Sequence, residues 1–340
     1  MQTSPLIFQS SRKTALHIVL AKIVADSLLE SNVPGDILIW FDQLTTGPTP
    51  HQSSLEEMSK VRTRYLRSAF QWPYIADTSW QAPDLKERDQ VLMGCADWEE
   101  VVLWFGPTVI EQFSMMQILA ALSKQKTGST RLSLVSCPRD LMAVYRPEEL
   151  ATFFDARTTI NRSQIKFAEK AWSLYCAPDP MPLFRFATRN LKSRPIICNA
   201  ILWQFLRYPA VGSGLSILEC MLLNQITTYD SVRHAVGITA ADDHAVLMWD
   251  VEEIYQMMWD FMHLPTPLIE KQSRKERVRS RKGFNKLIVG LTAFGREVLE
   301  GAADNVAVNG INRWIGGVHL KGNTVRWRWN AKRCVLQQSK

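Results

Sequence analysis

The sequence predicts an α/β protein with a mostly parallel open sheet flanked by helices. Four runs in the first 140 residues are apolar throughout, and each stops at a turn or at the start of a helix. Unbroken apolar runs are typical of strands buried on both faces, as in a parallel sheet that helices cover. The predicted strands are residues 16–20, 36–41, 100–105 and 132–137.

Four pairs of residues, each three positions apart, have the residue types of a helix capping box and predict where helices begin. After Thr108, apolar residues recur at spacings of 4, 3 and 4, which predicts a helix with one face against the sheet. The four pairs are Ser54 and Glu57, Thr108 and Glu111, Ser216 and Glu219, and Asp250 and Glu253.

We expect three regions along the chain: an α/β domain over 1–145, a helical region over 146–211 and a C-terminal module over 212–340. In the last region, helices over 216–226 and 250–263 flank a stretch from 227 to 246 that we expect to be irregular. A basic loop and a strand over 286–291 follow. Helices that precede a strand pair across a basic loop resemble a winged helix.

The composition limits the classes of protein that fit. No apolar run approaches the ~18 to 20 residues that a membrane span needs, and no apolar segment near the N-terminus is long enough for a signal peptide. The six cysteines include no Cys-x-x-Cys pair, which argues against a zinc site or a disulfide framework. We therefore expect a cytoplasmic protein without a metal, its cofactor and oligomeric state undetermined.

Positive charge is concentrated at the C-terminal end. The net charge is +7, yet the last 71 residues carry 16 Lys or Arg against five acids. This asymmetry favours a surface that faces a polyanion such as nucleic acid, although a solvated basic surface without a partner would look the same. The candidate nucleic-acid-binding residues are Arg274, Lys275, Arg277, Arg279, Arg281 and Lys282.

Residues that follow the predicted strands are the candidates for a ligand site, because the carboxyl ends of parallel strands meet at one edge. Asp42 could be a general base or a ribose ligand there, or it could cap the turn toward Gly47. His17 is the other catalytic candidate. It lies within a strand, so a buried structural imidazole is the alternative.

Three further residues complete the predicted site. Lys22 at a helix start opposes the helix dipole, a conflict that a bound phosphate or carboxylate would relieve. Gly106 and Thr108 follow the third strand, and helix capping alone would explain Thr108. We expect Lys22, Asp42, Gly106 and Thr108 to surround one small anionic ligand.

Other chemical motifs are weak. The chain has neither a glycine-rich phosphate loop nor a Gly-x-Ser-x-Gly motif. Four polar residues between 234 and 244 could meet a metal, but without ligand spacing they are more typical of a solvated segment. They are His234, Asp242, Asp243 and His244.

The C-terminal Trp and Arg residues allow two interpretations. Tryptophans interleaved with arginines could stack bases and neutralise phosphates. Alternatively, Trp327 and Trp329 face inward from a half-buried strand with Arg328 outward, and Gly316 and Gly317 make a hairpin or a close contact.

Several short motifs occur in a characteristic order along the chain. They are LHIV at 16–19, WFD at 40–42, VLWF at 102–105, AW at 171–172, PDP at 178–180, WIGGVH at 314–319 and WRW at 327–329. Together they resemble the bacterial proteins grouped as domain of unknown function 1835 with its C-terminal extension. The resemblance implies no activity. Two positions depart from the family pattern: Lys22 follows the first strand where that pattern has Gly-Asp-Ser, and Pro107-Thr108 replaces a His-Asp pair.

Three functional hypotheses follow. The first is a regulatory or binding protein with an anionic small-ligand site in the α/β domain and a basic module that contacts nucleic acid. The second is a hydrolase or transferase that acts on a phosphorylated or nucleotide substrate through Asp42, Lys22 and His17. The third is a protein-interaction scaffold.

Overall fold

The computed structural model describes residues 5–7, 13–69, 85–125, 128–136, 145–242, 251–272, 278 and 280–339. The chain forms two compact units. Unit 1 consists of residues 1–67, 81–200 and 316–318, and unit 2 of residues 68–80, 201–315 and 319–340. The predicted helical region of residues 146–211 is therefore shared, and its part up to Ala200 belongs with the sheet of unit 1.

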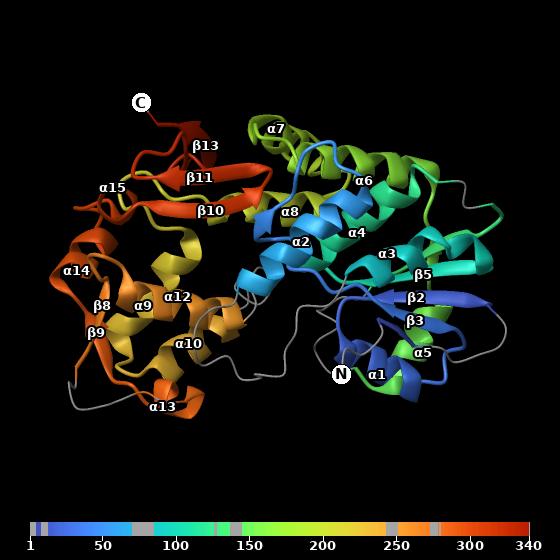
Figure 1. The fold of residues 1–340 in the computed structure, drawn as a ribbon, viewed down its shortest axis with the longest axis horizontal. Coiled ribbons are helices and arrows are strands. Elements are labelled where there is room, and N and C mark those ends of the chain that lie inside the picture. The colour runs from blue at the N-terminus through green and yellow to red at the C-terminus, as the bar shows by residue number, and fades with distance from the viewer. Residues whose placement is uncertain are drawn as a thin grey trace. The chain divides into compact units, whose positions relative to one another are not determined.

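Unit 1 contains a six-stranded sheet in the order β1-β3-β2-β5-β6-β7 (Figure 1). The four central strands are parallel, and β2 and β5 are buried along their whole length, which confirms the prediction from the apolar runs. Two antiparallel edge strands of two residues each were not predicted. The strands are β1 (Leu6–Ile7), β2 (Ala15–Val19), β3 (Asp36–Ile39), β5 (Glu100–Phe105), β6 (Arg131–Ser136) and β7 (Thr158–Thr159).

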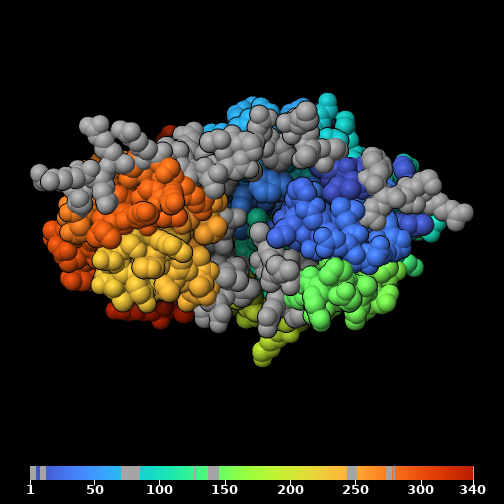
Figure 2. Space-filling view, turned by 90° about the horizontal axis from the view of Figure 1, so that it is seen from below, coloured from blue at the N-terminus to red at the C-terminus, as the bar shows by residue number. Residues whose placement is uncertain are grey.

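Helices cover both faces of this sheet, with α1 and α5 on one face and α3 and α4 on the other (Figure 1). Beneath α1 and α5, Val19 and Trp104 of the sheet share a core with Leu28 and Leu150. Figure 2 shows α1 and α5 side by side. The helices are α1 (Lys22–Glu30), α2 (Leu55–Ala69), α3 (Leu85–Met93), α4 (Val109–Leu122), α5 (Pro147–Asp155), α6 (Arg162–Tyr175), α7 (Met181–Asn190) and α8 (Pro195–Gln204), with the short strand β4 (Gly47–Pro48) and a 3-10 turn at Cys95–Asp97.

The predicted helix starts at Ser54 and Thr108 of unit 1 are confirmed, but one helix face was predicted wrongly. The Thr108 hydroxyl accepts the Glu111 N–H at the start of α4, and the Ser54 hydroxyl accepts the Glu57 N–H before α2. α4 was expected to bury a single face against the sheet. It is buried on nearly all sides, because α6 packs against it as well.

Unit 2 begins with helices that enclose one apolar core, in which Leu222, Val236 and Met258 meet. The stretch from 227 to 246, expected to be irregular, contains α10, which the Ser231 hydroxyl caps by accepting the His234 N–H. The elements are a 3-10 turn at Phe205–Arg207, α9 (Ile217–Thr228), α10 (Val232–Ala241), α12 (Val251–His263), β8 (Ile269–Lys271), α13 (Arg281–Asn285), β9 (Val289–Leu291), α14 (Ala293–Leu299) and α15 (Asn305–Asn309).

Small antiparallel sheets end the chain: β10 (Ile311–Gly316) lies beside β11 (Val318–Gly322), and β12 (Trp327–Asn330) pairs with β13 (Val335–Gln338). The turn at Gly316 has a φ of +61°, and a Cβ on Gly317 would collide with the Cys176 carbonyl oxygen. These glycines therefore make both the predicted hairpin and the predicted close contact.

The inward and outward pattern predicted for β12 was wrong at one position. Arg328 is only 8% exposed, and its guanidinium lies 3.2 Å from the Asp304 carboxylate. An arginine with an ion-pair partner can be buried, and alternation of residue types does not reveal such a partner.

In the described part of the chain, no helix is long and apolar enough to cross a membrane.

Candidate ligand-binding site

A cavity of about 300 Å³ lies in unit 1 at the carboxyl ends of β5 and β6. Parallel sheets place their ligand sites at this edge. The two strands contribute their last residues, α4 and α6 form the walls, and the first turn of α8 completes the lining. The lining residues are Phe105, Gly106, Pro107, Gln112, Met115, Leu119, Leu134, Ser136, Thr158, Ile160, Gln164, Phe167, Ala168, Ser193, Arg194, Pro195, Ile196 and Ile197.

The walls of the cavity are mainly apolar, and several of its polar side chains already have partners. The Gln112 Nε2 donates to the Gly106 carbonyl oxygen at 2.7 Å, which fixes the turn after β5. The Gln164 Oε1 accepts the Asn161 N–H at 2.9 Å as part of the capping box of α6. The Ser193 hydroxyl donates to the Asn190 carbonyl oxygen.

Arg194 is the cationic side chain among the described lining residues. Its guanidinium carbon lies 5.8 Å from the ring centroid of Phe167, and it forms no ion pair with any carboxylate in the described ranges. The described lining contains no Asp or Glu. An arginine without a carboxylate partner, placed on an apolar cavity, is available to bind an anion.

The start of α8 adds positive partial charge to the same place. Arg194 directly precedes Pro195, which opens the helix, and Ile196 and Ile197 of the first turn line the cavity. The first N–H groups of a helix have no acceptor within it, and they carry the positive end of the helix dipole. The potential at this end of the cavity therefore favours a negative group.

Of the residues predicted as ligands, Gly106 lines the cavity, whereas Lys22, Asp42, Thr108 and His17 do not. Lys22 lies on the surface of α1, and its Nζ is 2.6 Å from the Asp26 carboxylate one turn along the helix. That contact offsets the unfavourable interaction with the helix dipole without a ligand. The Thr108 hydroxyl donates to the Glu111 carboxylate at 2.6 Å within the cap of α4.

Asp42 is fully buried and has a structural partner that the sequence did not indicate. Arg62 of α2 donates to both Asp42 carboxylate oxygens, with a shortest distance of 2.7 Å. The same guanidinium donates to the carbonyl oxygens of Gln43 and Thr46. Asp42 thus holds the loop after β3 against α2, and its oxygens are occupied.

A second buried arginine reinforces this loop. The Arg88 guanidinium donates to the Asp89 carboxylate at 2.7 Å and to the Phe41 carbonyl oxygen, and it lies 3.8 Å from the ring centroid of Trp40. Burial raises the pKa of Asp89, although Arg88 opposes that shift. The two arginines make the carboxyl end of β3 a closed structural cluster.

His17 is buried, and both of its ring nitrogens are engaged. The Trp104 indole N–H donates to Nδ1 at 3.0 Å, and Nε2 lies 3.1 Å from the Pro34 carbonyl oxygen, which can only accept. The ring is therefore the neutral Nε2–H tautomer. Burial lowers the pKa of His17 to about 4.

The predicted nucleic-acid-binding residues, and the polar residues between 234 and 244, are only partly described. Arg274, Lys275, Arg277 and Arg279, together with Asp243 and His244, lie outside the described residues. Arg281 pairs with Glu252, and its guanidinium lies 4.3 Å from the Tyr255 ring centroid, whereas Lys282 is exposed. Within the described ranges, no three His, Cys, Asp or Glu side chains come close enough to hold a metal.

Sequence reasoning missed Arg194, the residue that gives the cavity its charge. The available signal was Pro195, since proline is favoured in the first turn of a helix and so marks a positive helix end. The sequence does not show that this helix end returns to the carboxyl ends of β5 and β6.

No protein-family model matches the chain, and no significant match is found among curated proteins. The resemblance to domain of unknown function 1835 stays a prediction.

Proposed function

We propose that this protein binds a small anionic ligand in the cavity of unit 1, as a regulatory or binding protein. The observation that carries the proposal is Arg194, a guanidinium on an apolar cavity with no carboxylate partner in the described ranges. A buried or half-buried cation without a partner is costly, and a bound anion would remove that cost. A volume of about 300 Å³ is at the lower end of the range for small-molecule sites.

The alternative hypothesis, a hydrolase or transferase, relied on Asp42, Lys22 and His17 as reacting groups. Asp42 accepts from Arg62 with both oxygens, and His17 uses both ring nitrogens inside the sheet. A general base must reach the proton that it removes, and neither group lines the cavity. These contacts favour binding over the proposed catalysis.

The test is calorimetric titration with benzene sulfonate, a compact monoanion with an apolar ring, and with its neutral analogue phenol. We expect the full chain to bind the sulfonate, and Arg194→Gln to weaken that binding about tenfold or more, because a hydrogen bond to a charged group contributes about 1.5 to 3 kcal/mol.

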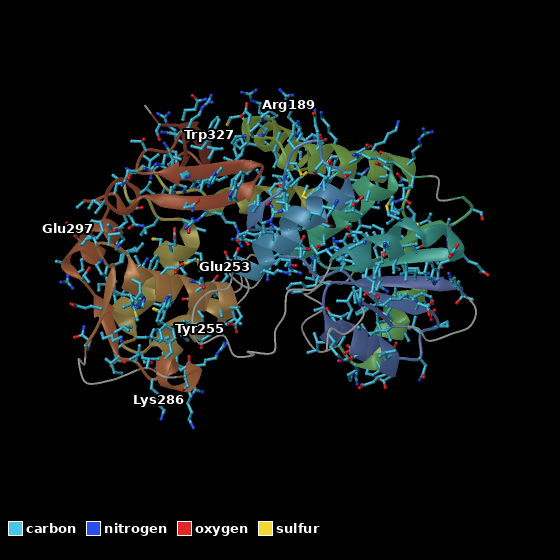
Figure 3. All side chains as sticks on the ribbon, viewed as in Figure 1. Arg189, Glu253, Tyr255, Lys286, Glu297 and Trp327 are labelled. Atoms are coloured by element: carbon cyan, nitrogen blue, oxygen red, sulfur yellow. The ribbon has the colours of Figure 1, made fainter. Side chains whose placement is uncertain are left out.

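The matched control is Arg189→Gln. Arg189 is exposed on α7 (Figure 3) and lies outside the cavity lining, so this variant should bind like the wild type. Equal binding by wild type and Arg194→Gln would contradict the proposal. Thermal melts of both variants would show that each is folded.

Unit 2 supports a second candidate function, contact with nucleic acid by a winged-helix-like module. The carbonyl oxygen of Asp230 accepts the Val289 N–H, and Ser231 bridges Ile288 in antiparallel fashion, so the segment between α9 and α10 lies beside β9. β9 also pairs with β8. Three helices with a sheet in this order resemble a winged helix, and helix-turn-helix modules of this kind place one helix in a groove of DNA.

The charges of this module favour phosphate contacts at α13 over groove reading by α12. The first turn of α12 carries Glu252 and Glu253, which pair with Arg281 and Arg207. These arginines are already engaged by carboxylates, so this turn offers phosphates no excess positive charge. Lys282 and Lys286 are exposed at α13, where Lys286 projects from unit 2 (Figure 3). We therefore expect weak, sequence-independent binding.

The test is fluorescence anisotropy with labelled duplex DNA at several salt concentrations. Replacing Lys282 and Lys286 with Ala should weaken binding and flatten the slope of log K against log salt by about 0.9 for each phosphate that the protein no longer neutralises. Replacing exposed Lys332 and Arg333 in the turn between β12 and β13 is the matched control. If the wild type does not bind DNA at low salt, this second candidate function is ruled out.

We also propose that the protein is cytoplasmic, and its free cysteines support this location. In the described ranges Cys95, Cys176 and Cys198 are buried free thiols, and free thiols persist in reducing compartments.

A further inference from the structure

We infer that the ligand of the unit 1 cavity is an amphipathic monocarboxylate, such as a medium-chain fatty acid or a compact aromatic acid, and not a nucleotide. This inference rests on the proposed function, because it names the class of anion that the same site would take. Three features carry it: the number of charges, the chemistry of the walls and the size of the cavity.

The positive charge of the site is suited to a ligand with one negative charge. The described lining offers a single guanidinium, that of Arg194, together with the first turn of α8. A guanidinium presents two parallel N–H groups in a fork that fits the two oxygens of a carboxylate. A nucleotide phosphate carries more than one negative charge near neutral pH, and the described lining has no second cation to balance it.

The apolar side chains of the cavity walls are suited to a ligand with an apolar body. Met115 and Leu119 of α4 form one side of the cavity, and Phe167 of α6 forms another. At its mouth, Ile196 is 53% exposed, so a ligand with an apolar body would cover hydrophobic surface that now faces solvent. The Arg194 guanidinium lies 5.8 Å from the Phe167 ring centroid, so the cationic group and an apolar wall are neighbours.

The polar groups of the cavity are poorly suited to a nucleobase or a ribose. Gln112 uses its Nε2 on Gly106, and Gln164 uses its Oε1 on Asn161. A base and a sugar present several donors and acceptors, and each one left unpaired against Met115 or Leu119 would reduce affinity. The walls therefore favour an apolar body over a base and a sugar.

The cavity volume sets the size of ligand that it can enclose. If each non-hydrogen atom takes roughly the 30 Å³ that a water molecule takes in the liquid, about 300 Å³ encloses about ten such atoms. Octanoate has that size, and so does a substituted benzoate. Longer chains would extend beyond the cavity into solvent and would gain little further affinity.

The experiment is calorimetric titration of the full chain with octanoate, octanol, octyl phosphate and adenosine monophosphate. We expect octanoate to bind about tenfold or more tightly than each of the other three compounds. Arg194→Gln should weaken octanoate binding about tenfold to a hundredfold and leave octanol binding unchanged. Arg194→Lys should recover only part of the loss, because an ammonium cannot make the two parallel bonds. Arg189→Gln should bind octanoate like the wild type.

The outcomes separate this inference from the proposed function. Tighter binding of octyl phosphate or adenosine monophosphate, dependent on Arg194, would overturn the carboxylate class and leave the anion site standing. Octanoate binding that Arg194→Gln does not change would indicate adsorption to apolar surface and would overturn the inference. If neither octanoate nor benzene sulfonate binding depended on Arg194, the proposed function itself would fail.

Discussion

The buried imidazole of His17 should make the stability of unit 1 depend on pH between about 6.5 and 4. Burial lowers the pKa of His17 from 6.5 to about 4. The Trp104 N–H points at Nδ1, so a proton on that nitrogen would face another donor. Within this pH window the unfolded chain binds a proton that the folded chain does not, and acidification therefore favours unfolding.

The sign and the magnitude follow from the two pKa values. The contribution of His17 to the free energy of unfolding is complete above pH 6.5 and is lost as the pH falls toward 4. The loss relative to neutral pH is about 2 kcal/mol at pH 5 and about 3 kcal/mol at pH 4.

The perturbation is His17→Asn, which keeps an acceptor for the Trp104 N–H but does not titrate. This variant should be less stable than the wild type at pH 7.5, because it no longer has the hydrogen bond to Pro34 or the edge-on packing against Phe154. Its stability should fall by about 2 kcal/mol less than that of the wild type between pH 7.5 and pH 5. Urea unfolding at each pH measures both quantities.

His51→Asn is the matched control, since His51 is an exposed histidine in the same unit, and it should follow the wild-type curve. NMR titration of the His17 ring gives a direct measurement, with an expected midpoint near pH 4. The reasoning is refuted if the ring titrates near 6.5, or if wild type and His17→Asn lose stability in parallel.

Three further predictions concern stability, each measured by urea unfolding. Asp42→Asn should destabilise unit 1 by about 3 to 5 kcal/mol, because it leaves Arg62 charged and buried. Asp26→Asn, at the exposed pair with Lys22, should lower stability by no more than about 1 kcal/mol. Similar losses of stability in the two variants would show that burial does not decide the difference. Gly317→Ala should lower the free energy of unfolding by about 1 to 3 kcal/mol, because its Cβ meets the Cys176 carbonyl oxygen. Gly237→Ala should not lower it, because there is open space at that position. A Gly317→Ala variant as stable as the wild type would contradict the close contact. Ser231→Ala should lower the free energy of unfolding by about 1 kcal/mol, because it removes the cap of α10. Ser231→Asn should retain most of the stability, because Asn can also cap a helix. Equal losses in the two variants would argue against the cap.

The sequence predicted the central sheet because burial on both faces leaves a local pattern of apolar residues. It could not predict β1 and β7, since two residues are too few to show any periodicity. It also missed α10, because Ser231 caps this helix without a Glu or Gln three residues later, where His234 stands.

The candidate site was harder to predict because its contacts are distant in the sequence. Asp42 lies at the predicted strand end, but its role depends on Arg62, twenty residues away on α2. Gly106, one of the predicted ligand residues, lines the cavity because it directly follows β5. Arg194 reaches the same edge because α6 packs against α4 and the start of α8 lines the same cavity, and no local pattern encodes that arrangement.

The two short edge strands have a consequence for how unit 1 behaves at high concentration. β1 and β7 each run antiparallel to the parallel core and each has only two residues. Pro5 precedes β1, and its carbonyl oxygen accepts the Ile39 N–H while its ring nitrogen has no hydrogen to donate. A long exposed strand edge would offer backbone groups to another molecule. The described sheet ends instead in strands too short to template such pairing, which protects its apolar core strands from joining into intermolecular sheets.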